Sequence, residues 1–265
     1  MCIITLNWQP AGPQSLLLAA NRDEFYARPA SKLHHWPGQH ILAGQDLRAG
    51  GTWLGLGTCP DSGQIRLAAL TNYRDIASHK IDAASRGHIT TSFLNSSVSA
   101  KSYLDTLVTA SRLYNPFNLI LFDGQVLMGF ESRHARLFVL PAGITSVSNA
   151  DFNTPWPKLE HLHRSFERTI AVNADETLVQ DRIFKLLSDS RMAPDDALPQ
   201  TGLSMERERV LSAAFIRTPD YGTRASSVIR IKDRVAKFTE RSFDANGFKG
   251  EVTETISWSN SCPLQ

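Results

Sequence analysis

A cysteine at position 2 and a run of four polar residues at positions 21–24 are the first candidates for chemistry in this chain. Two apolar runs, residues 2–8 and 16–20, flank a turn that contains Pro10, Gly12 and Pro13, a pattern typical of a β-hairpin. The first run opens with the cysteine, and the second ends in Asn-Arg-Asp-Glu. A polar cluster at the end of a strand is a common place for a functional site, because a rigid element holds it.

The cysteine has a specific chemical use at this position. Its side chain is small enough for methionine aminopeptidase to remove Met1, which would leave Cys2 with a free α-amine. An α-amine titrates near ~8, so it can act as the base that activates the thiol of its own residue. The alternative is that Cys2 is an ordinary small residue at the start of a buried strand, since cysteine is among the most buried residue types.

The order of Cys2, a turn and Asn-x-Asp resembles the cysteine N-terminal-nucleophile hydrolases, whose second strand ends in Arg-Asn-x-Asp. Asn21 and Asp23 match that pattern, whereas Ala20 stands where those hydrolases have arginine. The chain more closely resembles the NRDE family, also called the transport and Golgi organisation protein 2 family, whose motif is Asn21, Arg22, Asp23 and Glu24 here. The resemblance runs from Met1 to about Glu240 and rests on six blocks in order: MCII…LAANRDEFYARP, GGTWLG, LAALTNYRD, YNPFNLI, SVSNADFNTPWPKLE and YGTRASSVI.

The resemblance to the hydrolases implies roles for five residues at strand ends: Cys2, Asp23, Asn72, Asn149 and Arg224. Cys2 would be the nucleophile, and Asp23 would hold its amine or orient its thiol. The two asparagines would form the oxyanion hole and position the amine, and Arg224 would lower the pKa of the thiol. Alternatively, the asparagines simply end their strands, and Arg224 and Asp23 form a buried ion pair.

Side chains alternate between the two faces of a strand, which divides the motif. Asn21 and Asp23 should share one face, and Arg22 and Glu24 the other. We predict that the first pair faces the functional cleft and that the second pair forms structural ion pairs.

A carrier function competes with the hydrolase. The NRDE resemblance implies a part in haem trafficking, with acyl or lipid handling as a further possibility, so that haem would be cargo and no cofactor would be required. Cys-Pro dipeptides occur at some haem sites, and the chain has two, at Cys59 and Cys262, although a turn and a tail would also explain them. His34 and His35 are candidate axial ligands, although histidines are often simply exposed.

The sequence alone favours the carrier narrowly, because Ala20 departs from the hydrolase pattern. Its ligand would be a small apolar molecule bound by Cys2, Asn72, Asn149 and Arg224, with Cys59 a weaker candidate. The alternative is a cysteine-nucleophile hydrolase that cleaves a linear C–N bond in an acyl or lipid-type substrate. In both cases the same cleft would be used.

Composition limits the remaining possibilities. The 265 residues are 42% hydrophobic and 20% charged, with a net charge of +2, and Lys and Arg are scattered, which gives no support for nucleic-acid binding. Three widely spaced cysteines argue for a reducing compartment, and no zinc-ligand spacing is present. No apolar run approaches the ~20 residues of a membrane span, and no secretory signal is evident, so we expect a cytoplasmic protein.

The order of elements predicts the fold. We expect strands, two helices, strands, two more helices and final strands, with no linker that would divide residues 1–265 into two domains. This order fits an α+β four-layer αββα sandwich of two antiparallel sheets, which is the fold of the N-terminal-nucleophile hydrolases. The expected helices cover residues 82–95, 99–114, about 154–170 and 175–188. The expected strands after the first hairpin cover residues 52–56, 64–71, 117–122, 126–130, 135–139, 144–148, 213–217, 224–232, 235–241 and 252–258. Residues 25–50 are expected to be loop-rich, and residues 191–209 are expected to form a polar surface excursion.

Overall fold

Two antiparallel sheets form the centre of the molecule in the computed structural model, which describes residues 1–172 and 174–259. The six-stranded sheet has the order β10 (Gly143–Val147), β1 (Cys2–Trp8), β2 (Gln14–Phe25), β11 (Tyr221–Lys232), β12 (Val235–Asp244), β13 (Gly247–Ser257). The seven-stranded sheet runs in chain order: β3 (Ala30–His35), β4 (Ile41–Asp46), β5 (Leu54–Thr58), β6 (Ile65–Asn72), β7 (Phe117–Phe122), β8 (Leu127–Glu131), β9 (Arg136–Val139).

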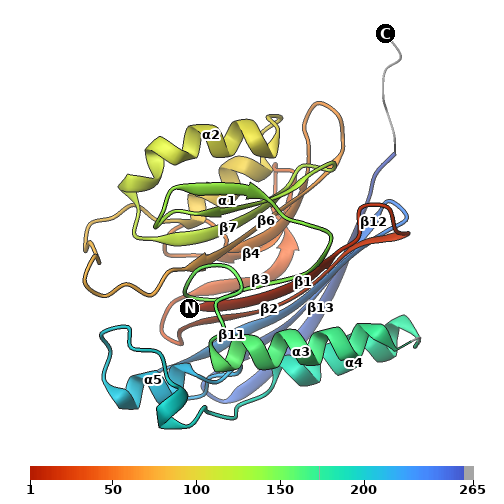
Figure 1. Ribbon diagram of the computed structural model, residues 1–265. Coiled ribbons are helices and arrows are strands. Elements are labelled where there is room, and N and C mark those ends of the chain that lie inside the picture. Colours follow the sequence, from red (N-terminus) through yellow and green to blue (C-terminus); the bar gives the residue numbers. More distant parts are fainter. Residues whose placement is uncertain (173, 260–265) are drawn as a thin grey trace.

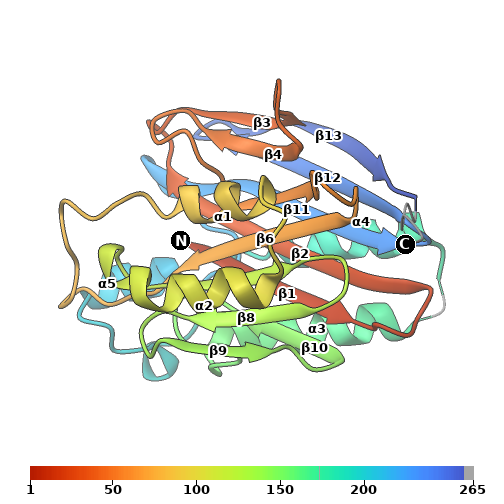
Figure 2. The same cartoon turned by 90° about the horizontal axis from the view of Figure 1, so that it is seen from above.

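A pair of helices covers the outer face of each sheet. Helices α1 (Gly87–Leu94) and α2 (Ala100–Ala110) pack on the seven-stranded sheet, and α3 (Pro157–Ala171) and α4 (Glu176–Leu187) pack on the six-stranded sheet. Figure 1 shows the four layers from the side, and Figure 2 shows α1 and α2 in front when the molecule is seen from above. The predicted four-layer α+β sandwich is therefore confirmed.

The alternation of side chains along β1 and β2 builds two apolar layers at once. Ile4, Leu6, Leu16 and Leu18 point between the sheets, where they join the central core. The intervening residues of the same strands, Ile3, Leu17 and Ala19, pack against α3 and α4. Each buried Leu or Ile contributes about 1.5–3 kcal/mol, so a hairpin that is apolar on both faces belongs in the middle of the sandwich.

The first hairpin and three of the four helices lie close to their predicted positions, but four details differ. The region 25–50, expected to be loop-rich, contains β3 and β4. The predicted strand 213–217 is wrong, because among the described residues the buried residues 213–216 pair with no strand, and the exposed Arg217 forms one isolated bridge. The polar excursion 191–209 contains most of helix α5 (Met205–Leu211), and α1 begins at Gly87 rather than near residue 82.

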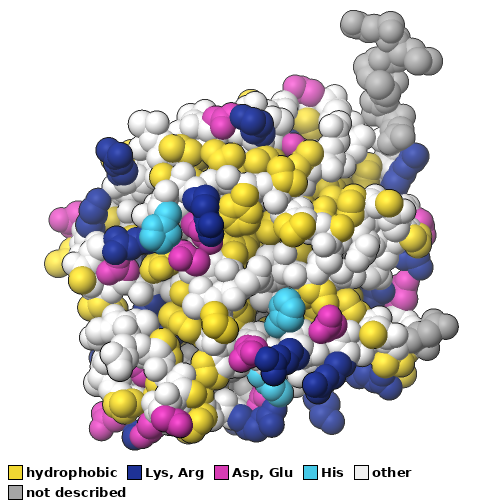
Figure 3. Space-filling model, viewed as in Figure 1, with side chains coloured by type: hydrophobic (Ala, Val, Ile, Leu, Met, Phe, Trp, Pro, Cys, Tyr) yellow, Lys and Arg dark blue, Asp and Glu magenta, His cyan; other side chains and the backbone are white. Residues whose placement is uncertain are grey.

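The outer surface of α3 is polar, as its position on the outside of the sandwich requires. His161, Arg164 and Glu167 are exposed, whereas Leu162 and Phe166 are buried against the sheet. Figure 3 shows charged and histidine side chains over this helix. Within the part of the chain that the structure describes, no helix is both long and apolar enough to cross a membrane.

Candidate functional site

A cavity of about 650 Å³ opens between the ends of the two sheets, beside the amino terminus. The ends of β1, β2, β4, β6 and β11 line it, together with the loop before α1 and the β12–β13 hairpin. Its lining is rich in charged side chains: Arg22, Asp23, Glu24, Arg28, Lys32, Asp46, Arg48, Arg86, Arg224, Glu240, Asp244 and Lys249. The sequence-predicted residues Cys2 and Asn72 also line it.

The thiol of Cys2 points into this cavity because of the strand register. Cys2 lies opposite Arg22, and like Ile4 two residues later it points between the sheets. Burial raises the pKa of the Cys2 thiol to about 11, while the nearby amino terminus and Arg22 act to lower it and Asp23 acts to raise it. The thiol is therefore protonated near neutral pH as long as Met1 is present.

Met1 extends the pairing of β1 and β2 by one residue. Its ammonium group donates to the backbone oxygen of Asp23 at 2.5 Å and to the hydroxyl of Tyr221 at 2.9 Å. The backbone N–H of Asp23 donates to the oxygen of Met1 at 2.5 Å. The peptide bond between Met1 and Cys2 is thus held directly beside Asp23.

Asp23 has an incompletely satisfied carboxylate. Its Oδ1 accepts a hydrogen bond from the hydroxyl of Thr223 at 2.7 Å, but its buried Oδ2 has no hydrogen-bond partner among the described residues. Burial raises the pKa of Asp23, and the amino terminus and Lys158 act in the opposite direction. An oxygen without a partner beside the amino terminus is suited to receive an α-amine.

The two predicted asparagines have different surroundings. The side-chain amide of Asn149 donates to the backbone oxygen of Asn72 at 2.9 Å, and its oxygen accepts from Ser148 at 3.2 Å. Asn149 is fully buried and ties the end of β10 to the end of β6. The side chain of Asn72 lines the cavity and makes no hydrogen bond to any described residue. Of the two amides, only that of Asn72 is free to meet a ligand there.

A β-bulge directs Arg224 into the cavity. In the pairing of β11 with β2, Thr223 lies opposite Asp23 and Ala225 lies opposite Arg22, so that Arg224 is the extra residue. Its guanidinium donates to the backbone oxygens of Phe25 at the end of β2, of Tyr26 and Arg28 in the loop that follows, and of Phe243 in β12. Arg224 thus holds the cavity wall together, whereas Arg22 acts to lower the pKa of the thiol, which burial keeps above its ordinary value.

The prediction that Asn21 faces the cleft is wrong. Asn21 and Asp23 do share a face, but it is the face toward the helices: the Asn21 amide donates to the backbone oxygens of Leu187 and Ala214. These bonds satisfy a fully buried amide, which gives Asn21 a structural role.

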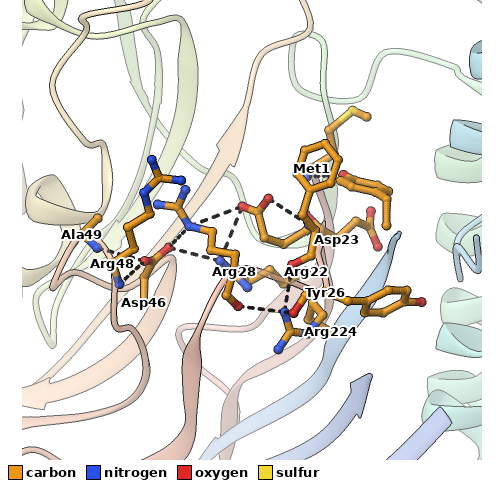
Figure 4. A network of polar contacts seen from close by, with 12 residues as sticks. Met1, Arg22, Asp23, Tyr26, Arg28, Asp46, Arg48, Ala49 and Arg224 are labelled. Carbon is orange, nitrogen blue, oxygen red and sulfur yellow. Dashed lines mark hydrogen bonds and ion pairs between the residues drawn. The ribbon is translucent and has the colours of Figure 1, made fainter. Parts of the chain in front are cut away.

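The predicted ion pairs of Arg22 and Glu24 are present, but they lie in the cavity wall. Arg22 and Arg28 contact Asp46 at 3.3 and 2.5 Å, and both also lie within 4 Å of Glu24. Figure 4 shows this network next to Met1 and Arg224. The side of the strand that we expected to be structural is therefore the side that faces the cavity.

The match of a family model adds to this geometry. A model described as Transport and Golgi organisation 2 matches residues 1–245. The chain belongs to this family. It is 37% identical to the Transport and Golgi organization protein 2 homolog of Bos taurus over 263 residues and 35% identical to that of Homo sapiens over 265 residues. Each alignment covers 91% of this chain and 93% of the relative.

A more distant member is the Transport and Golgi organization protein 2 of Drosophila melanogaster, at 27% identity over 96% of both chains. Among solved structures, a Caenorhabditis elegans N-acylethanolamine-hydrolyzing acid amidase ortholog aligns with a TM-score of 0.47 and 12% identity, over 86% of this chain and 92% of that chain.

Two cations near the thiol of this transport and Golgi organisation 2 family member were missed by sequence reasoning. Lys158, in the first turn of α3, is buried behind the site, and its Nζ lies 3.5 Å from the side-chain oxygen of Asn149. Burial lowers the pKa of Lys158 to about 8, Arg74 adds to that effect, and Asp23 opposes it. Arg86, just before α1, lines the cavity itself. Both residues look like ordinary surface charges in the sequence.

The candidates for haem ligation lie elsewhere. Cys59 is buried at the far end of β5 and is not part of the cavity lining. His34 stacks on Trp36, and His35 lies 3.9 Å from Glu254, so neither reaches the cavity. Cys262, in the second Cys-Pro dipeptide, lies outside the described residues.

Proposed function

We propose that this chain is a hydrolase of linear amide bonds in which Cys2 is the nucleophile after removal of Met1. One observation carries the proposal: the thiol of Cys2 and the free amide of Asn72 line one cavity, at the strand end where Asp23 keeps an oxygen without a partner. A nucleophile, an oxyanion donor and a group to hold the base are the parts that such a reaction needs.

Removal of Met1 is essential to the proposal. With Met1 in place, the amino group belongs to Met1 and is bonded to the backbone of Asp23 and to Tyr221, so Cys2 has no α-amine of its own. The pKa of its thiol is about 11, so the thiol is protonated near neutral pH. Cleavage of the Met1–Cys2 bond would place the α-amine on Cys2 itself, beside Asp23. The amine could then take the thiol proton within one residue.

Each residue then has a defined part in the reaction. The thiolate of Cys2 attacks the carbonyl carbon of the amide, and the side-chain amide of Asn72 donates a hydrogen bond to the oxygen that becomes negative. The ammonium group of Cys2 returns its proton to the leaving amine as the C–N bond breaks, which leaves a thioester. Water, deprotonated by the same amine, attacks the thioester carbonyl. The C–S bond then breaks, which releases the acid and restores the thiolate of Cys2 beside its ammonium group. Asn149 acts as a positioning residue through its bond to Asn72.

A carrier of haem or a similar ligand is the second candidate. The arginines of the cavity could pair with the carboxylates of such a ligand, and a thiol could bind iron. The charged lining speaks against an apolar cargo, because sites for apolar molecules are lined mainly by hydrophobic side chains. A cytoplasmic location remains a prediction for either function.

The first experiment is the intact mass of the protein purified from its native host. We expect a mass that lacks one methionine, and hydrolysis of amide or thioester probes by that form. Cys2→Ala should abolish turnover, and Asn72→Ala should lower kcat about 10²–10³-fold, as expected for loss of an oxyanion donor. Cys59→Ser, outside the cavity, is the control and should keep full activity.

A retained Met1 together with absence of turnover would contradict the hydrolase. Haem titrated into the Met1-retaining protein would then test the carrier, whose binding should weaken when Cys2 is replaced but not when Cys59 is.

A further inference from the structure

The positive charges around the cavity are mostly neutralised by the protein itself. Arg22 and Arg28 share Asp46 and Glu24, and Lys249 lies 3.2 Å from Asp244. The guanidinium of Arg224 is occupied by backbone oxygens. These residues form the wall of the cavity, and their positive charges already have partners in the protein, so they are less available to a ligand.

Arg86 is different. Its Nη1 donates to the backbone oxygen of Pro116 at 3.1 Å, and no carboxylate of the described residues lies within 4 Å of its guanidinium. The Nε and Nη2 donors make no hydrogen bond to the described part of the chain, although the residue is half-buried and lines the cavity. Burial lowers the pKa of Arg86, while Cys2 and Glu24 act to raise it.

The backbone holds this arginine in position. Arg86 precedes α1, and a Cβ added to Gly51 would lie only 2.4 Å from the carbonyl carbon of Gly87. The loop before β5 therefore packs directly on the first residue of the helix. A guanidinium that is fixed, half-buried and free of a carboxylate has the properties of an anion-binding group, because its planar fork matches a carboxylate.

We propose that Arg86 binds a carboxylate of the ligand, so that the cavity prefers acyl compounds that carry an acidic group near the carbonyl that Cys2 attacks. The inference rests on the proposed use of the Cys2 cavity and names a substrate class for it. The acidic group would accept hydrogen bonds from the donors of Arg86 that the protein leaves unpaired.

The test is a binding measurement that needs no turnover. Calorimetry on the Cys2→Ala protein compares glutaryl-p-nitroanilide with pentanoyl-p-nitroanilide, which has a chain of the same length but no carboxylate. We expect the glutaryl probe to bind about 10-fold tighter or more, as a charge-assisted hydrogen bond provides. Adding Arg86→Gln should remove that preference and leave the pentanoyl probe unchanged. Arg48→Gln, at the exposed rim of the same cavity, is the matched control and should keep the preference.

Equal binding of the two probes, no binding of the glutaryl probe, or a preference that survives Arg86→Gln would each overturn the proposal. If Arg86→Gln does not fold, Arg86→Lys keeps the charge without the fork and should lose part of the preference. The hydrolase proposal fails separately, by absence of turnover in the Met1-processed wild type, so the two failures can be told apart.

Discussion

Cys2 and Arg22 lie opposite each other across a strand pair, and that register determines which polar residues reach the thiol. The sequence places Arg22 and Asp23 next to each other, but alternation sends their side chains to opposite faces. Which face holds the cavity could not be predicted, because it depends on how the second sheet lies over the hairpin. This is why the residues at strand ends were found but the role of Asn21 was not.

The roles of the two asparagines could not be predicted from the sequence either. Asn72 ends β6 and Asn149 lies just beyond β10, and nothing in the local sequence distinguishes a free amide from one bonded to the backbone. The distinction arises because the ends of β6 and β10, on different sheets, meet at the site. Lys158 shows the same limit, since only the packing of α3 reveals that its charge is buried.

The buried Lys158 should make the unfolding free energy depend on pH. Its pKa is about 8 in the folded protein and near 10.5 when unfolded, so between these values the unfolded chain binds more protons and the unfolding free energy rises with pH. We expect Lys158 to contribute about 1 kcal/mol to this rise between pH 8 and 9. Above pH 9 the Cys2 thiol acts in the opposite direction, because its pKa is raised to about 11 on folding.

Urea unfolding at pH 8 and 9 tests this expectation by comparing wild type with Lys158→Met. Lys158→Met should lack the contribution of Lys158 to the rise in unfolding free energy between these pH values. Lys185→Met, at an exposed position of α4, should show the same rise as wild type. Identical pH slopes for wild type and Lys158→Met would show that the ammonium group of Lys158 is not desolvated.

At the scale of elements, the helices with periodic apolar residues and the strands with apolar runs were predictable. The strands β3 and β4 and the structure of the segment 213–217 were not. The helix α4 begins after Asp175, as its cap residue predicts, since an Asp at this position accepts a hydrogen bond from the backbone of Thr177. In contrast, β3 and β4 lie in a region whose prolines and glycines obscure the strand pattern. The apolar residues 213–216 are buried, but no strand in the described part of the chain pairs with them.

Gly51 is expected to be irreplaceable at its contact with α1. A methyl group there would meet backbone atoms of Gly87 at 2.4–2.8 Å, and backbone cannot rotate away. Gly51→Ala should therefore lower the unfolding free energy by about 1–3 kcal/mol, the usual range for overpacking. Gly87→Ala is the matched control, since its methyl group would meet the Gly51 backbone at 3.3 Å and would favour the helix.

Chemical denaturation of the two variants provides the comparison. The expected order of stability is Gly51→Ala clearly below Gly87→Ala, and a Gly51→Ala protein as stable as wild type would mean that α1 moves aside without cost. Because Arg86 directly precedes this contact, Gly51→Ala should also weaken the preference for the glutaryl probe.

At the scale of the whole molecule, the cavity end of the sandwich is held by polar contacts between layers. Arg74 follows β6 in the seven-stranded sheet, and its backbone N–H donates to the oxygen of Asn149, beyond β10 in the other sheet. Its guanidinium contacts Glu208 of α5 at 2.6 Å, and both side chains are almost completely buried. Glu208 also accepts hydrogen bonds from Thr201. These contacts join the second sheet, the first sheet and the segment before β11.

This buried pair should show strong coupling in a double-mutant cycle. Arg74→Leu or Glu208→Leu alone leaves an uncompensated buried charge and should cost about 3–5 kcal/mol of unfolding free energy. The double variant removes both charges and should cost clearly less than the sum of the two, which denaturant unfolding of the four proteins would measure. Additive losses would instead mean that water or Lys158, which lies in the same buried cluster, takes over the charge left behind. In that case the ion pair would contribute nothing specific to the cavity end, and the hydrogen bonds that join Arg74, Asn149 and Asn72 would remain as its polar contacts between layers.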